Sequence, residues 1–390
     1  MVGSPGVLRS FPLLLALLVL ALAAPARAGE PALAPDASPA AAPLGLGTPG
    51  PFRQLFLDPP LSDARAVATP SFAVRLESAN SWSVPSSFGR DGHVVEVQND
   101  VEAEALVLSL RLPWTLFAPG GFRERLATTI RWRVTAFWGG FEDGAIEAWH
   151  GLVGAYNFQR QHYPRDQIHL RMIEPGGPRA VDLQSGRLSA GDLVLATQAL
   201  LASGGRAEAR GSAPDAPGWG ISTRLDLKLP TGALSQAGGS GGVDASLAVL
   251  GSFELARWVV LHAMIFGSIT SPLSSSIALQ PRTFHAGTDV SAAFLVGPIT
   301  LLVEDRYLSA LMESGWTSLD GGNNDVYLSS AYISLFRPHN QISFGLRWRN
   351  LTVSFSEDFT PGSNPRAYHD WFYNENAPDT VLAIGYTLPL

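Results

Sequence analysis

The sequence predicts an all-β protein, a transmembrane antiparallel up-and-down β-barrel of about 12 strands with a short helix in its longest extracellular loop. Three observations predict this fold. Apolar and polar side chains alternate over many segments of about ten residues, which is the length that a tilted strand needs to cross a bilayer. An apolar leader precedes these segments, and short and long connections alternate between them.

The leader, residues 1–28, is a predicted signal peptide. Arg9 precedes an apolar run from Phe11 to Leu22, and the small-x-small pattern Ala26-Arg27-Ala28 follows it. A retained membrane anchor is the alternative, but the run is shorter than the ~20 residues that a spanning helix needs. We therefore expect cleavage after Ala28 and export of the mature protein to the outer membrane of a Gram-negative bacterium.

The mature chain divides into two predicted parts. Residues 29–50 are rich in proline and alanine and show no apolar periodicity, so we expect a flexible lead-in. Residues 51–390 are expected to form the barrel. A secreted β-sandwich is the alternative for this part, but its connections need not alternate in length.

Composition narrows the functional classes. Hydrophobic residues make up 46% of the chain and charged residues 16%, whereas about 25% is typical of charged residues in a soluble domain. The formal net charge is -7 and no basic block occurs, so nucleic acid is not expected as a partner. The chain has no cysteine, which excludes a disulfide framework, a CxxC site and a thiolate nucleophile.

The stretch ISTRLDLKLPTG, residues 221–232, illustrates the alternation. Leu225 and Leu227 fall on one face of a strand, and the charged residues between them fall on the other. Charged positions along the chain that we expect to face the lumen are Arg131, Arg133, Arg224, Asp226, Lys228, Glu304, Arg306, Arg347 and Arg349. A pore lined in this way would favour anions. Alternatively, salt bridges between these charges fill the interior.

The connections support a barrel. Tight turns are expected at residues 254–257, 296–298 and 336–341, and long connections, rich in Gly, Asn, Asp and aromatic residues, separate them. This alternation is typical of outer-membrane barrels, which have short periplasmic turns and long outer loops. The alternating phase is lost near Asn350, where a bulge or an extra hairpin would change the number of strands.

The longest loop contains the segment FEDGAIEAWHGLVG. Its apolar residues recur at helical spacing, which predicts a short amphipathic helix from Phe141 to Val153. Glu147 and His150 have the Glu-x-x-His spacing that presents two metal ligands on one helix. A metal site needs three or four ligands and no second matching helix occurs, so we expect neither a metal nor another cofactor.

We expect this helix to fold into the mouth of the barrel, because its apolar face needs cover. In that position the acidic residues Glu142, Asp143 and Glu147 would meet the inward arginines Arg131, Arg133 and Arg347. The helix would then constrict the lumen.

Several spaced motifs carry a family resemblance. They are PFRQLFLDPP at residues 51–60, GGFEDGAIEAWHGLVG at 139–154, SGRLSAGDLVLA at 185–196, RLDLKLPTG at 224–232 and FSEDF at 355–359. Together they resemble an uncharacterised family of outer-membrane proteins, the DUF3187 (domain of unknown function) family. The resemblance implies an outer-membrane barrel of unknown activity and supplies no catalytic residues.

Three functions fit these features. The first is a channel for small solutes, with anions favoured by the inward arginines. The second is a plugged barrel with a structural or surface-interaction role and no transport. The third is an outer-membrane enzyme that modifies lipids, but no Ser/His pair has a spacing that suggests a nucleophile and its base, so we do not expect an enzyme.

The expected partners follow from the membrane setting: outer-membrane lipids, lipopolysaccharide, the barrel assembly machinery and small solutes. The last predicted strand keeps its alternation through Tyr386 and Leu388 but ends on Leu390, where such strands commonly end on an aromatic residue.

Overall fold

The computed structural model describes residues 41–47, 50–117, 121–153, 163–205, 218–319, 335–358 and 380–390. These residues belong to one compact unit that spans residues 35–390. No helix in these ranges is long and apolar enough to cross a membrane. The predicted signal peptide lies outside the described residues.

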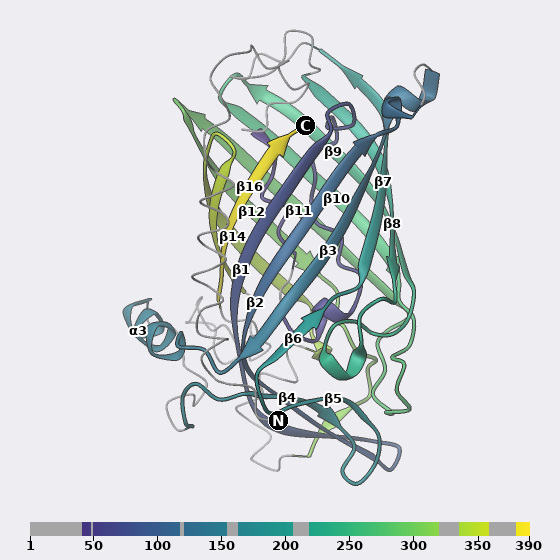
Figure 1. Cartoon of the computed structure of the whole chain (residues 1–390), viewed down its shortest axis with the longest axis vertical. Coiled ribbons are helices and arrows are strands. Elements are labelled where there is room, and N and C mark those ends of the chain that lie inside the picture. The colour runs from purple at the N-terminus through teal and green to yellow at the C-terminus, as the bar shows by residue number, and fades with distance from the viewer. Residues whose placement is uncertain are drawn as a thin grey trace. The chain divides into compact units, whose positions relative to one another are not determined.

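Twelve antiparallel strands form a closed barrel, as predicted. They follow one another around the wall in chain order, and β1 pairs with β16 to close it (Figure 1). The strands of the wall are β1 (Ser71–Arg90), β2 (His93–Pro113), β3 (Leu126–Trp138), β7 (Leu193–Gly204), β8 (Trp219–Leu229), β9 (Asp244–Ala256), β10 (Val259–Ile269), β11 (Phe284–Val296), β12 (Ile299–Leu308), β14 (His339–Trp348), β15 (Leu351–Asp358) and β16 (Thr380–Pro389).

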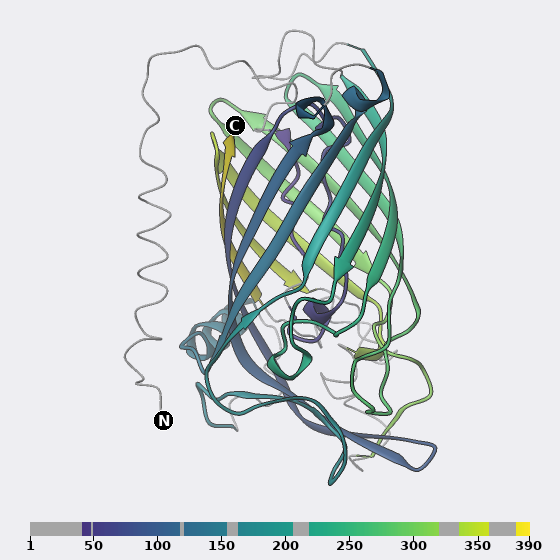
Figure 2. The same ribbon diagram turned by 45° about the vertical axis from the view of Figure 1, so that its right-hand side comes forward.

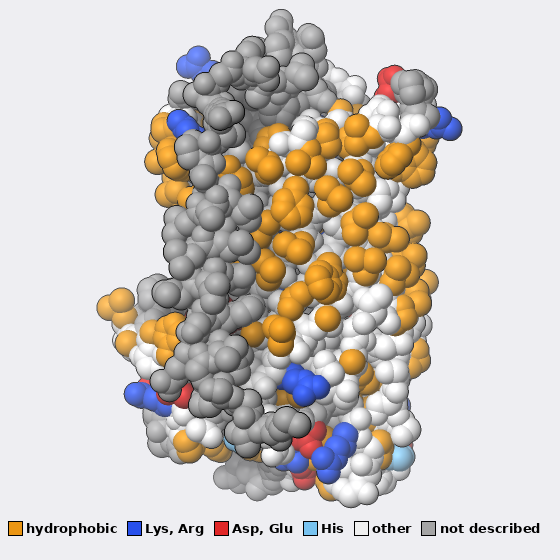
Figure 3. Space-filling model, viewed as in Figure 1, with side chains coloured by type: hydrophobic (Ala, Val, Ile, Leu, Met, Phe, Trp, Pro, Cys, Tyr) orange, Lys and Arg blue, Asp and Glu red, His pale blue; other side chains and the backbone are white. Residues whose placement is uncertain are grey.

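The two faces of each strand differ as the sequence predicts. On β8 the side chain of Leu225 is 56% exposed, whereas Arg224 and Asp226 on either side are buried. The outward residues of neighbouring strands are apolar as well, and Figure 3 shows the apolar side chains that they gather on one face of the wall. An exposed apolar band outside and charges inside are the features of an outer-membrane barrel.

Tight turns join strands at the end of the barrel where β16 finishes. They fall at residues 257–258, 297–298 and 349–350. The third explains the loss of phase near Asn350, because Arg349 has a φ of 54° and lets the chain reverse within two residues. The turn that we expected at residues 336–341 is wrong, since β14 has already begun at His339. Short turns and both ends of the wall mark this end as periplasmic.

The β1–β2 hairpin extends beyond the other strands at the extracellular end. Its two strands are 20 and 21 residues long, whereas about 9–11 residues cross a bilayer. Three short strands flank the extension, β4 (His169–Ile173) and β5 (Arg179–Leu183) beside β2, and β13 (Thr317–Ser318) beside β1. A fourth, β6 (Arg187–Ala190), continues the wall next to β3.

The polarity of β2 reverses where the strand leaves the membrane. From Leu106 to Leu112 the even-numbered residues face outward and are leucines, and the odd-numbered residues include Ser109 and Arg111. From Glu96 to Glu104 the even-numbered residues are polar or acidic, and most odd-numbered ones are buried and apolar. Lipid therefore ends, and an internal apolar core begins, near residues 104–106.

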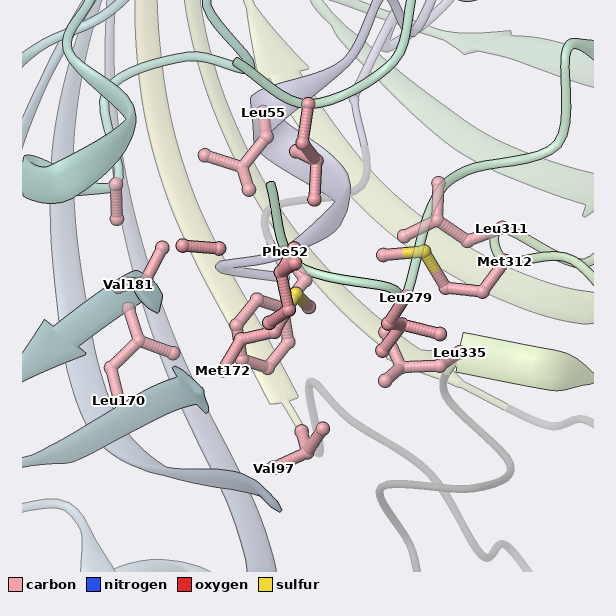
Figure 4. Close-up of a cluster of buried hydrophobic side chains, with 14 of the residues drawn as sticks. Phe52, Leu55, Val97, Leu170, Met172, Val181, Leu279, Leu311, Met312 and Leu335 are labelled. Atoms are coloured by element: carbon pink, nitrogen blue, oxygen red, sulfur yellow. The ribbon is translucent and has the colours of Figure 1, made fainter. Parts of the chain in front are cut away.

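A hydrophobic core spans the extracellular mouth. Side chains from β2, β4, β5 and the connections after β10 and β12 meet around Phe52 and Leu55 (Figure 4). Phe88, also in this core, packs against Phe336 with ring centroids 5.3 Å apart. Because these elements come from different sides of the barrel, their packing covers the end of the lumen.

The helices are short. They are η2 (Arg53–Leu55), η3 (Trp114–Leu116), η4 (Gly121–Arg125), α3 (Asp143–Val153) and η6 (Leu234–Gln236). The helix predicted at residues 141–153 is α3. Figure 1 shows it outside the wall, and Figure 2 shows the segment before β1 running inside the barrel.

Candidate functional site

Residues 41–47 and 50–70, which we call the plug, lie inside the barrel. We expected residues 29–50 to form a flexible lead-in, but the part of it that the structure describes is held by the wall. Alternation could not reveal this, because apart from η2 the plug has no regular secondary structure. Its backbone polar groups therefore need partners on the wall, and the inward side chains supply them.

The ingoing leg of the plug is bound through its backbone. Arg347 donates hydrogen bonds to the carbonyls of Ala42 and Pro43, at 2.6 and 3.2 Å. Glu304 accepts from the N–H groups of Leu44 and Gly45, at 3.0 and 3.2 Å. A cationic and an anionic side chain of the wall thus satisfy the carbonyl and N–H groups of one stretch of the plug.

The plug turns at η2 beneath the extracellular core. Lys228 donates to the carbonyl of Leu55 at 3.1 Å and also binds Asp192 at 2.7 Å. Asp244 lies 3.3 Å from the same ammonium group and accepts from the N–H of Leu57. Lys228 is only 1% exposed, so two carboxylates and a peptide carbonyl compensate for the burial of this charge.

The returning leg is bound by polar residues of β7, β8 and β9. Gln198 donates to the carbonyls of Asp63 and Ala64, at 3.0 and 3.1 Å. Ser222 also donates to the carbonyl of Ala64, and Ser252 accepts from its N–H at 2.8 Å. The leg ends at the periplasmic rim, where β1 begins.

A serine and a histidine connect the two legs. Ser252 is 2.8 Å from Nδ1 of His262, and Nε2 of His262 is 2.7 Å from the carbonyl of Ala41. The network is satisfied when Nε2 carries the proton and Ser252 donates to Nδ1. Sequence spacing gave no hint of this pair, because its members come together only when β9 and β10 align. Both are buried beneath the plug, and their hydrogen bonds hold it in place.

The structure places most of the charged residues expected at the lumen inside the barrel. Arg131, Arg224, Asp226, Lys228, Glu304, Arg306 and Arg347 contact the plug or one another. Arg133 is half-buried and binds Glu77 at 2.6 Å. Arg349 is different, because it lies in the exposed β14–β15 turn and its guanidinium stacks over Trp348.

Sequence reasoning missed several lumen residues. Arg75 binds Glu77 at 2.7 Å and the carbonyl of Gly45 at 3.0 Å. Arg111 lines the lumen from β2, and Asp192 binds Lys228. The alternation of β1 and β2 already placed Arg75, Glu77 and Arg111 on the inward face. Their position in the lumen could therefore have been predicted from the sequence.

A row of three cavities lies beside the plug along β1, β2 and β3. The first, of about 250 Å³, reaches the periplasmic rim, and the middle and last have volumes of about 140 and 70 Å³. Ser109, Arg111 and Thr129 line both the first and the middle cavity, and Arg131 lines both the middle and the last. The row therefore follows the wall from the periplasmic rim towards the extracellular core.

Cations outnumber carboxylates along this row. The cationic side chains are Arg75, Arg111, Arg131, Arg133, Arg224, Lys228, Arg347 and Arg349, and the acidic ones are Asp58, Asp63, Asp192 and Asp226. Glu77 and Asp244 pair with three of the cations from outside the cavities. The lining keeps a positive excess.

Helix α3 does not enter the lumen. The residues at its start contact outward-facing side chains of the wall: Glu142 accepts from Ser78 at 2.6 Å, and Asp143 accepts from Asn80 at 3.2 Å. Glu147 binds Arg165, and this ion pair raises the pKa of Arg165. The expected contact with inward arginines fails because the plug already occupies that space. The side chain of His150 lies outside the described part of the structure.

Glu102, Glu104 and Glu142 form the acidic group that could hold a metal ion in the described part of the chain. One carboxylate oxygen of each lies within 4.8 Å of the others. Burial raises the pKa of Glu102 to about 8, although the N–H of Glu142 donates to it and opposes the shift. The group lies at the outer rim, just beyond the apolar band, and not in the lumen.

Comparisons with solved structures give low sequence identities. The COG4313 outer membrane channel from Pseudomonas putida F1 is 11% identical, with 83% of this chain and 96% of that chain covered and a TM-score of 0.44. The NanC porin is 7% identical, with 82% and 99% covered and a TM-score of 0.37. The P. putida toluene transporter TodX is 9% identical, with 85% and 93% covered and a TM-score of 0.36.

No curated protein matches the chain. A family described as "Protein of unknown function (DUF3187)" matches residues 30–317, which is most of the chain. The match agrees with the resemblance carried by the sequence motifs. The protein therefore belongs to the DUF3187 family.

Proposed function

We propose that the protein is an outer-membrane channel for small solutes, that it prefers anions, and that the plug closes it in this conformation. The observation that carries the proposal is the row of cavities with its excess of cations. A lumen of fixed positive charge lowers the energy of an anion and raises that of a cation, so it selects by charge.

The way in which the plug is bound supports a channel that opens. Its legs are held largely by side-chain hydrogen bonds to peptide groups, each worth a net ~0.5–1.5 kcal/mol, or ~1.5–3 kcal/mol where the side chain is charged. Water in a widened lumen would replace such bonds. The backbone hydrogen bonds between the wall strands do not depend on these side-chain bonds, so the plug can move while the barrel stays closed around it.

A second candidate is a plugged barrel without transport. The hydrophobic core over the extracellular mouth favours it, because moving that core exposes apolar surface to water. The two candidates differ in whether ions cross the barrel once the plug is displaced.

Planar-bilayer recordings decide between them. The mature protein, residues 29–390, is expected to show intermittent openings whose reversal potential in a salt gradient indicates anion selectivity. A variant that lacks residues 41–66 should conduct steadily with the same selectivity. Heat-modifiable gel mobility of both proteins verifies that the barrel is folded. A folded, plug-deleted barrel that passes no current would instead establish the barrel without transport, and cation selectivity would overturn the anion preference.

A further inference from the structure

We propose that the first cavity is a binding site for a small organic anion, a carboxylate on an apolar body, and that Arg111 binds the carboxylate. This inference rests on the proposed function, since it names the class of solute that the channel would hold. It depends on an arginine that makes no hydrogen bond and no ion pair among the described residues.

Arg111 faces the lumen from β2, where it lies between Ser71 of β1 and Thr129 of β3. Its side chain lines the first and the middle cavity. Among the described residues it makes no hydrogen bond and no ion pair. By contrast, Arg75 and Arg347, which line the same cavity, each bind the plug.

Asp63 is the carboxylate in the lining of the first cavity, and its charge is already compensated. Its two oxygens accept hydrogen bonds from Nε and Nη2 of Arg65, at 3.0 and 2.7 Å. The five N–H donors of the Arg111 guanidinium therefore have no hydrogen-bond partner among the described residues. A cation without a partner in a partly apolar lumen is costly, and a bidentate carboxylate would relieve that cost.

The remaining walls favour an apolar body next to the carboxylate. Pro43, Leu44 and Leu46 of the plug and Ala383 of β16 supply apolar side chains to the lining of the cavity. Its volume of about 250 Å³ exceeds that of an engineered apolar cavity of ~150 Å³ that binds benzene. One aromatic ring or a short alkyl chain therefore fits together with a carboxylate.

Calorimetric titration of the folded mature protein with benzoate tests the site. Arg111→Gln should weaken benzoate binding about tenfold or more, since a hydrogen bond to a charged group is lost. Arg111→Lys should have an intermediate affinity, because it keeps the charge but not the planar fork. Arg123→Gln is the matched control: it removes one exposed arginine at the periplasmic end and should leave the affinity unchanged.

The apolar half of the proposal has its own test. Gly385→Leu places a side chain in the cavity, and a Cβ there would meet no atom closer than 3.7 Å. This variant should weaken benzoate binding, and benzamide or inorganic phosphate should bind the wild type more weakly than benzoate does. Equal benzoate affinity in Arg111→Gln would overturn the site, and phosphate binding as tight as benzoate binding would overturn the ligand class.

Binding and conduction are measured separately, so the two proposals fail separately. Benzoate binding that depends on Arg111 in a barrel that never conducts would leave the site standing without the channel. Conduction without such binding would leave the channel standing and reject the site.

Discussion

Arg306 on β12 binds both legs of the plug with one guanidinium group. It donates to the carbonyl of Leu46 on the ingoing leg at 2.6 Å, and to Asp58 and the carbonyl of Pro59 on the returning leg. Asp289 lies 3.6 Å from the same group. This side chain therefore fixes the distance between the legs as well as their position on the wall.

Replacing Arg306 with glutamine should loosen the plug. The change removes the ion pairs that Arg306 makes with Asp58 and Asp289, and breaking a buried ion pair in this way costs about 3–5 kcal/mol. We expect faster proteolysis within residues 41–70 and more frequent channel openings, with heat-modifiable mobility retained. Arg257→Gln, at the exposed β9–β10 turn and outside the cavities, should change neither. Equal protease resistance in both variants would contradict the role given to Arg306.

A charge placed on the outward, lipid-facing side of β8 should destabilise the barrel. Leu225→Arg should destabilise the barrel by roughly 2–4 kcal/mol if the position lies near the midplane, because a charge then faces hydrocarbon. Leu225→Ala removes the same apolar side chain without adding charge and should cost much less. The free energy of unfolding in urea, measured in lipid bilayers, compares the two. Equal losses would show that this face does not contact lipid.

The extracellular core predicts a local effect. Leu279 is fully buried in it, and Leu279→Ala should cost about 2–5 kcal/mol through lost burial and a cavity. We expect faster amide hydrogen exchange in β4 and β5, with the barrel strands unaffected. Leu255→Ala, at a position 72% exposed on the outer face, is the control. Unchanged exchange in β4 and β5 would mean that the core does not order them.

The raised pKa of Glu102 predicts a pH dependence at the outer rim. The carboxyl is more basic in the folded protein, with a pKa of about 8 against an ordinary 4.5. Its stabilising contribution is therefore fully present below about pH 4.5 and is lost as the pH rises through about 8. Hydrogen exchange at residues 139–143, corrected for its intrinsic pH dependence, should accelerate over this range. Glu102→Gln should abolish the dependence, and a dependence that survives it would assign the effect to another group.

The wall of the barrel could be predicted from sequence because lipid outside and water or charge inside impose a two-residue period on every strand. That period placed Leu225 and Arg224 on the correct faces. The sequence of β2 also shows the reversal of polarity at residues 104–106. This reversal indicates that the strand continues beyond the membrane on the extracellular side.

The plug could not be predicted in the same way. Its residues are held by wall side chains that are distant in sequence, such as Glu304 with Leu44. A local periodicity in the sequence does not indicate such long-range contacts. The composition of its first part, residues 41–47, is that of a linker, and residues 50–70, most of which we expected in the barrel, show no strand periodicity. The expected place of α3 failed for the same reason, since nothing in the sequence indicated that the lumen was already occupied.

Fastening the plug to the wall with a disulfide tests most directly whether the plug gates the barrel. Gly345 on β14 faces Leu44, and a Cβ at Gly345 would lie 3.3 Å from Cγ of Leu44. Cysteines at these two positions should therefore approach the Cβ separation of about 3.5–4.5 Å that a disulfide needs. The chain has no cysteine of its own, so the pair Leu44→Cys and Gly345→Cys can form a single defined cross-link.

The measurement is the bilayer conductance of this double variant before and after reduction, with each single variant as a control. We predict no openings while the disulfide is intact, and a return of anion-selective openings when it is reduced. A fully cross-linked protein that conducts as well as the reduced one would show that the plug does not gate the barrel.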